Sequence, residues 1–192
     1  MILVVDIGNT NIVVGCMEGK KAIFRERLST ARRETRLEYS VLFKTAFDMY
    51  GIDYKAVEGA IISSVVPSVT GIVKEAIEKL CGISVMVVGP GVKTGVSIVI
   101  DNPAQLGSDL VVDAVASVEE YSVPQIVIDM GTATTVSVIN KERQFIGGAI
   151  LPGVAVSHDA LIGRTSQLPK VAFEKPKKII GSNTIDSIKS GI

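Results

Sequence analysis

Residues 4–14 read VVDIGNTNIVV, and residues 127–138 read VIDMGTATTVSV. Both stretches have an apolar run, an Asp, one apolar residue, a Gly, a turn rich in Thr or Asn, and a second apolar run. An apolar run that ends in an acid is typical of a buried strand that carries a carboxylate at its end. The repeat, from Asp6 to Asp129, predicts two similar halves that face each other.

Composition excludes several classes of protein. The 192 residues are 47% apolar, and 20 Lys and Arg balance 20 Asp and Glu. This zero net charge gives no electrostatic footprint for nucleic acid or an anionic membrane, so we expect neither as a partner. No apolar run approaches the roughly 18 residues of a membrane span, and residues 1–9 lack the basic segment of a signal peptide. Cys16 and Cys81 have no metal-ligand spacing, so we expect buried thiols and a cytoplasmic protein.

Hydrophobic periodicity predicts an open α/β layer for the first half. The expected strands are residues 2–7, 11–17, 21–28, 59–66 and 84–88, and the expected helices are 36–50, 69–80 and 105–121. The second half repeats the beginning, with strands expected over residues 125–129, 136–140 and 143–151. We therefore expect two domains, residues 1–120 and 121–192, of which the second is incomplete because it lacks a matching set of strands and helices.

The Asp-x-Gly turn of each repeat suits the binding of phosphate and a metal ion. Gly8 lets backbone N–H groups approach an anion closely. Asn9, Thr10 and Asn11 add neutral hydrogen-bond donors. Asp6 can hold Mg²⁺ through water. One DIGNT segment is equally compatible with an ordinary tight turn, but two copies favour one nucleotide held between the halves.

Asp109 ends the segment LGSD, residues 106–109, at the start of a predicted helix. A hydroxyl that attacks a γ-phosphoryl group needs a carboxylate within hydrogen-bond reach, so Asp109 is a candidate general base. The alternative is that Asp109 only caps the helix or interacts with its dipole. We interpret Asp101 as a turn former and Asp113 as a solvated helix position. His158, the only histidine, is expected at the surface or at a helix start, because phosphoryl transfer needs no imidazole.

Seven segments, in order, resemble the motifs of type III pantothenate kinases. They are DIGNTN (6–11), RLST (27–30), SSVVP (63–67), DNPAQLGSD (101–109), DMGTATT (129–135), GGAILPG (147–153) and RTSQLP (164–169). The first and fifth also resemble the phosphate motifs of the superfamily of acetate and sugar kinases, actin and heat-shock chaperone ATPases. The resemblance implies two ribonuclease H-like halves with mixed sheets, and phosphorylation of pantothenate by ATP at the first step of coenzyme A biosynthesis.

The resemblance also implies roles for the matching residues. The ATP site would comprise Asp6, Ile7, Gly8, Asn9, Thr10, Asn11, Ile12, Val13 and, from the second motif, Thr132. Asp6 would lie near Mg²⁺, and Asp129 would bind a monovalent cation, K⁺ or NH₄⁺. Asp109 would be the catalytic base. The pantothenate pocket would comprise Ile100, Gly107, Ser108, Asp109, Leu110 and, across the interface of a homodimer, Thr184.

Two positions depart from the family pattern. Leu110 stands where the family has an Arg that can pair with the pantothenate carboxylate, and Ile100 stands where an aromatic residue is usual. Loss of such a charge-assisted contact weakens substrate binding by about 2–3 kcal/mol. Two alternatives stay open: an ATP-binding homologue with impaired catalysis and a regulatory role, or a kinase for another small alcohol that lacks a carboxylate.

Overall fold

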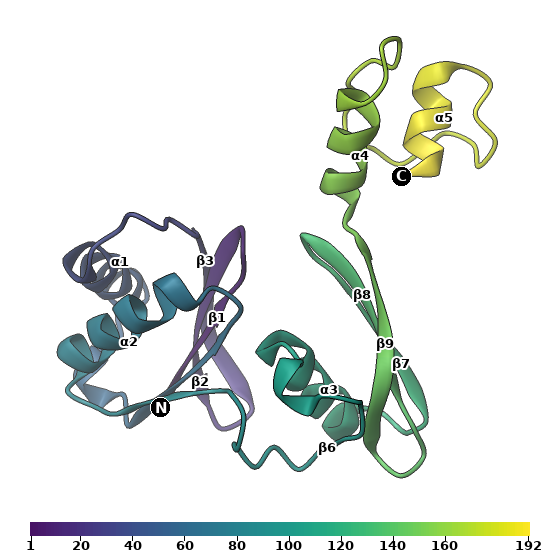
Figure 1. Cartoon of the computed structure of the whole chain (residues 1–192). Coiled ribbons are helices and arrows are strands. Elements are labelled where there is room, and N and C mark those ends of the chain that lie inside the picture. Colours follow the sequence, from purple (N-terminus) through teal and green to yellow (C-terminus); the bar gives the residue numbers. More distant parts are fainter.

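The computed structural model describes residues 1–192 and contains two mixed β-sheets (Figure 1). The first sheet has the order β3-β2-β1-β4-β5. Its strands are β1 (Ile2–Ile7), β2 (Asn11–Glu18), β3 (Lys21–Ser29), β4 (Gly59–Ser64) and β5 (Val85–Val87). β1 pairs antiparallel with β2 and parallel with β4, so the predicted α/β class with mixed sheets is confirmed.

Helices α1 (Arg36–Met49) and α2 (Pro67–Cys81) cover one face of the first sheet. Alternate residues of β1, Leu3, Val5 and Ile7, point into this layer and are buried. Period-two burial is what a half-covered strand requires, and each fully buried Leu, Ile or Val stabilises the fold by about 1.5–3 kcal/mol. Asp6 therefore faces the opposite, open side of the sheet, toward the second half.

The second sheet has the order β6-β9-β8-β7. Its elements are β6 (Ser97–Ile98), β7 (Gln125–Met130), β8 (Ala133–Ile139) and β9 (Gln144–Pro152). Helix α3 (Ser108–Glu120) lies between the two sheets and contacts β4, β7 and β8. A small core of Ala114, Val118, Ile139 and Phe145 joins α3 to the second sheet. Helices α4 (Val154–Gly163) and α5 (Thr184–Gly191) lie beyond the end of this sheet (Figure 1).

The internal repeat is confirmed in three dimensions. β1, β2 and β3 form an antiparallel meander, and β7, β8 and β9 form a second one. Asp6 pairs with Val13 across the first hairpin, and Asp129 pairs with Thr135 across the second. The two aspartates thus have equivalent places at the ends of their strands.

Three predicted element boundaries were wrong. Helix α2 begins at Pro67, because proline is favoured in the first turn of a helix, where its missing N–H costs nothing. Residues 105–107 do not belong to α3, since Pro103–Gln105 forms a separate 3₁₀ helix, η2, and α3 begins at Ser108. β8 begins at Ala133, so Thr134 and Thr135 belong to the strand and not to the turn that precedes it.

Predictions for single residues had mixed outcomes. Cys16 is buried, as predicted, and Cys81 is partly buried. The prediction of a surface His158 was wrong: its side chain is 1% exposed on α4, and its Nε2 accepts the N–H of Val171 at 3.3 Å. None of the helices is both long enough and apolar enough to cross a membrane.

Candidate functional site

The turns of the two sequence repeats meet in the structure. Thr10, between β1 and β2, and Thr132, between β7 and β8, have hydroxyl oxygens 2.9 Å apart, within hydrogen-bond distance. Both residues are exposed. A single ligand at this point is therefore able to contact both motifs.

Hydrogen bonds within the first turn fix its shape. The Gly8 N–H donates to the Asn11 carbonyl at 2.9 Å. Thr30 donates its hydroxyl to the Gly8 carbonyl at 2.7 Å and its N–H to the Thr10 carbonyl at 3.0 Å. The backbone N–H groups of Asn9 and Thr10 donate to no protein acceptor. Exposed N–H groups in a turn are suited to an anion, so these two amides, rather than that of Gly8, are free for phosphate.

The other expected ATP residues divide into two groups. Asn11 and Val13 are half-buried on the open side of the sheet. Ile7 and Ile12 are fully buried in the core beneath α1 and α2. An ATP contact through the side chains of these isoleucines is excluded, and only their backbone atoms remain available.

The chain that leaves β9 packs closely against the second turn. The Gly131 N–H donates to the Ala133 carbonyl at 3.0 Å, and the Gly153 N–H donates to the Thr132 carbonyl at 3.1 Å. A Cβ atom on Gly153 would overlap the carbonyl oxygens of Gly131 and Thr132. Position 153 therefore requires glycine because backbone atoms occupy the space of a side chain.

Two carboxylates, those of Asp6 and Asp113, have raised pKa values, and the charges of Asp109 and Asp129 contribute to both. Burial raises the pKa of Asp6, a hydrogen bond from Ser63 opposes that rise, and the charges of Asp109 and Asp129 raise the pKa further. Burial, followed by the charges of Asp129, Asp109 and Asp6, raises the pKa of Asp113 to about 6. The prediction of a solvated Asp113 was wrong. Its place one helical turn after Asp109 was the available signal, since residues four apart share a helix face.

The chemistry of these carboxylates fits the cations that the family resemblance implies. No group of three or more His, Cys, Asp or Glu side chains is arranged to hold a metal ion. An all-protein metal cage is therefore absent. Mg²⁺, however, usually keeps several waters and binds one or two carboxylates together with substrate phosphates. Asp6 and Asp129 supply such hard oxygen ligands, and a cation between them would reduce the repulsion that raises the pKa of Asp6.

Asp109 lies in the first turn of α3, where a negative charge is favoured. Its Oδ1 accepts the N–H of Leu110 at 2.8 Å. Gly107 is the N-cap residue, and a Cβ atom there would overlap Asp109 Oδ1. The carboxylate is thus folded back over Gly107, so this glycine leaves room for the candidate base.

Three expected substrate residues are used by the fold itself. Ser108 is buried, and its hydroxyl is bonded to the backbone of Ser64. Leu110 and Ile100 pack against the small core of the second half. Of the three side chains, Ser108 is buried, and Ile100 and Leu110 are partly buried, so a role for them toward pantothenate stays a prediction. The contacts with the small core also explain why apolar residues are tolerated at positions 100 and 110.

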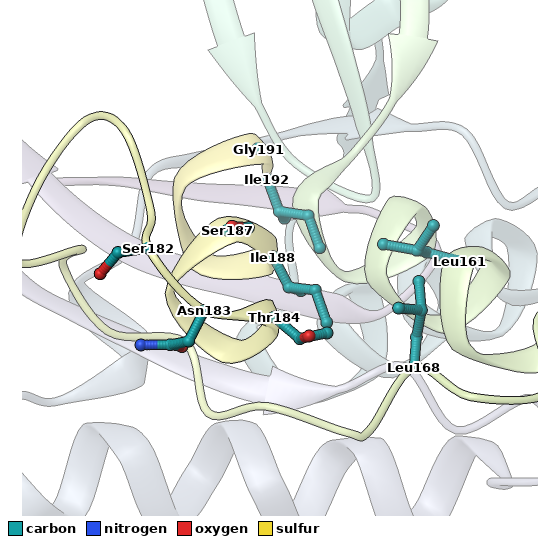
Figure 2. A pocket seen from close by; sticks show the side chains of 9 residues that line it. All are labelled: Leu161, Leu168, Ser182, Asn183, Thr184, Ser187, Ile188, Gly191 and Ile192. Atoms are coloured by element: carbon teal, nitrogen blue, oxygen red, sulfur yellow. The ribbon is translucent and has the colours of Figure 1, made fainter.

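Within one chain, Thr184 does not join the acidic cluster, by which we mean Asp6, Asp109, Asp113 and Asp129. It begins α5, is exposed, and lines a cavity of about 560 Å³ between α4 and α5, where Leu161 and Leu168 form the opposite wall (Figure 2). Helix α3, which carries Asp109, lies beside the second sheet, whereas α4 and α5 lie beyond the end of that sheet (Figure 1).

Sequence reasoning from the residues missed Thr30, Ser63 and Ser64. Thr30 holds the first turn through two hydrogen bonds, and the two serines bond to Ser108 at the start of α3. The only signal for them was that RLST and SSVVP lie among the resembling segments, since small hydroxyl residues have no distinctive periodicity.

Comparisons with known proteins agree with these motifs. A family model described as type III pantothenate kinase matches residues 2–192. The type III pantothenate kinase of Halalkalibacterium halodurans is 44% identical over 192 residues, which cover all of this chain and 76% of that protein. The one of Exiguobacterium sp. is 43% identical over 191 residues, which cover 100% of this chain and 75% of that protein.

A solved structure shows the same fold. The Baf family protein of Campylobacter jejuni has a TM-score of 0.54 and 19% identity to this chain, over 99% of this chain and 73% of that one. The match of the family model over almost every residue, together with the full-length identity to two curated relatives, shows the family. The chain belongs to the type III pantothenate kinases.

Proposed function

We propose that this chain transfers the γ-phosphoryl group of ATP to the hydroxyl of pantothenate, which gives 4'-phosphopantothenate at the first step of coenzyme A biosynthesis. One observation carries this proposal: the hydrogen bond between Thr10 and Thr132, which brings both phosphate motifs to one place. The charge of Asp109 contributes to the raised pKa of Asp6, which supports a site shared by the candidate base and the phosphate loop.

Different residues of the site bind the ATP phosphates and the cations. The free N–H groups of Asn9 and Thr10 bind ATP phosphate oxygens, and the Thr132 hydroxyl adds a donor from the second half. Asp6 would hold Mg²⁺ through water, and Asp129 would hold K⁺ or NH₄⁺. When bound, these cations neutralise charge on the transferring phosphoryl group.

Asp109 supplies the proton acceptor. The pantothenate hydroxyl oxygen bonds to the γ-phosphorus in line with the leaving oxygen, the bond from that phosphorus to the β-phosphate bridging oxygen breaks, and ADP leaves. The hydroxyl proton passes to the Asp109 carboxylate. The hydrogen bond from the Leu110 N–H to Oδ1 keeps this carboxylate at the start of α3.

The proposal includes a cytoplasmic homodimer, in which Thr184 contacts pantothenate bound to the partner chain. Support comes from the apolar surface around α4 and α5, where Ile179 and Ile180 are 90% and 84% exposed and Phe173 is also exposed. Exposed apolar groups in such proximity mark interaction surfaces. Zero net charge supports the absence of nucleic acid and membrane partners.

An assay of ADP formation tests the activity. We expect ADP formation that depends on pantothenate, increases when K⁺ or NH₄⁺ replaces Na⁺, and is lost in Asp109→Asn. A folded wild-type chain that forms no ADP in response to pantothenate would refute the proposal.

Leu110 favours a second candidate, an ATP-binding homologue with impaired catalysis. Its side chain packs against the small core and offers no cation to a substrate carboxylate. Calorimetry separates the candidates: ATP binding without pantothenate binding, and recovery of pantothenate binding in Leu110→Arg, would favour the second. Turnover of uncharged alcohols but not of pantothenate would instead identify a kinase for another small alcohol.

A further inference from the structure

Ser108 connects the N-terminus of α3 to the C-terminal end of β4. Its hydroxyl accepts the N–H of Ser64 at 2.8 Å and donates to the carbonyl of Ser64 at 2.8 Å. The side chain is only 8% exposed. A single hydroxyl thus satisfies both backbone groups of one residue in the first half while it belongs to the helix that leads to the second half.

The same hydroxyl also approaches the phosphate loop. Ser63 is 6% exposed, and its hydroxyl donates to the Ser108 hydroxyl oxygen at 3.3 Å. Ser63 is next to Asp6 across the β1–β4 pairing. Ser108, one residue before Asp109, is therefore bonded to the residue that lies beside Asp6 in the first sheet.

No other side-chain hydrogen bond joins α3 to the first half. Its N-cap residue is Gly107, which has no side chain and forms no capping hydrogen bond. Asp109 itself bonds only to the N–H of the next residue, Leu110. The position of the Asp109 carboxylate relative to the first half consequently depends on the bonds of Ser108.

We propose that Ser108 is a positioning residue, whose hydroxyl fixes the Asp109 carboxylate at the distance from the phosphate loop that proton transfer requires. Since this role requires Asp109 to be the base, it rests on the proposed function. Displacement of a reacting group by about 1 Å lowers a rate by as much as about 100-fold. Ser108 touches neither substrate nor phosphate in this role and acts only through Asp109.

The variants Ser108→Ala and Ser108→Thr test this role, with Thr70→Val as the matched control. Thr70 donates its hydroxyl to Ser64 Oγ at 2.7 Å, so it belongs to the same group of hydroxyls but is not attached to α3. The measurements are kcat, KM for ATP and for pantothenate, thermal unfolding, and hydrogen exchange of the Ser64 amide.

We expect Ser108→Ala to lower kcat by about 10- to 100-fold, to leave KM for ATP within about twofold, and to accelerate exchange of the Ser64 amide. Ser108→Thr, which keeps the hydroxyl, should recover most of kcat. Thr70→Val should lower the unfolding temperature and leave kcat unchanged.

Two results would overturn the role of Ser108. One is a kcat of Ser108→Ala equal to that of the wild type. The other is an equal loss of kcat in Thr70→Val and Ser108→Ala when both variants are destabilised to the same extent. Absence of turnover in the wild type would instead refute the proposed function, and the role of Ser108 with it. The wild-type assay therefore tells the two failures apart.

Discussion

Thr10 and Thr132 lie 122 positions apart in the sequence, and their hydroxyl oxygens are 2.9 Å apart in the structure. Each is the hydroxyl residue of an Asp-x-Gly turn, and each belongs to a different half of the molecule. The contact makes the two motifs parts of one site. It also means that a bound phosphate would compete with a hydrogen bond that the protein already has.

Thr10→Val and Thr132→Val test the shared site. Each variant removes one donor to ATP, so we expect KM for ATP to rise about 3- to 10-fold, which corresponds to about 0.5–1.5 kcal/mol for one hydrogen bond. Because the two hydroxyls contact each other, the effects in the double variant should not add. Thr45→Val is the control, since its hydroxyl bonds the Val41 carbonyl on α1, away from the cleft. Additive effects would show that the two threonines act separately.

Gly107→Ala tests the position of the candidate base. The new Cβ atom would overlap Asp109 Oδ1, while the φ angle of −59° is acceptable for alanine. A carboxylate is free to rotate away, so we expect kcat to fall about 10- to 100-fold with little change in the unfolding temperature. Gly71→Ala on α2 meets no atom within 4 Å and is the control, which should stabilise its helix by up to about 1 kcal/mol. Full activity of Gly107→Ala would contradict the assignment of Asp109.

Gly153→Ala tests the second turn. Its Cβ atom would overlap backbone carbonyl oxygens of Gly131 and Thr132, which have no freedom to rotate away. We expect a loss of about 1–3 kcal/mol in the free energy of unfolding and weaker ATP binding, measured by denaturant unfolding and calorimetry. Gly163→Ala, at the end of α4 and without a neighbour within 4 Å, should change neither quantity by much. Unchanged ATP affinity in folded Gly153→Ala would separate this turn from the nucleotide site.

Asp113→Asn tests the acidic cluster through pH. The native pKa of Asp113 is about 6, above the ordinary 3.8, because burial and three neighbouring carboxylates disfavour its charge. The stability that this group contributes is therefore fully present below pH 3.8 and is lost as pH rises through about 6.

At pH 8 the asparagine variant should exceed the wild type by about 1 kcal/mol in the free energy of unfolding, since solvent screens part of the repulsion. The difference should disappear near pH 4, as measured by urea unfolding at both values. A difference that is equal at the two pH values would show that charge is not its cause.

Much of the fold followed from the sequence. The strands and helices of the first half are close to their predicted limits, because alternating or 3.6-residue apolar patterns report which face of each element is buried. The repeat around Asp6 and Asp129 predicted two similar meanders, and both are present. Boundaries failed where local chemistry decided them, as at Pro67, which begins a helix instead of only ending a strand.

The candidate site was less predictable. The sequence indicated Asp6, Asp109 and Asp129, since an acid beside glycine and threonine is recognisable in one dimension. The spacing of four between Asp109 and Asp113 was the only signal that Asp113 belongs with them, and nothing in the pattern showed that Ser108 is turned toward Ser64. The role of a residue in a helix depends on which element packs against the face of the helix that carries it.

The sequence by itself determined the α/β class, the two Asp-x-Gly turns and the order of motifs typical of the family. Only the tertiary structure decided that Thr10 meets Thr132, that Leu110 packs against the small core, that His158 is buried, and that α3 is held at its start by one serine. The physical reason is that apolar periodicity encodes burial along a single element, whereas hydrogen bonds and charge repulsion between residues distant in the chain depend on how the elements pack.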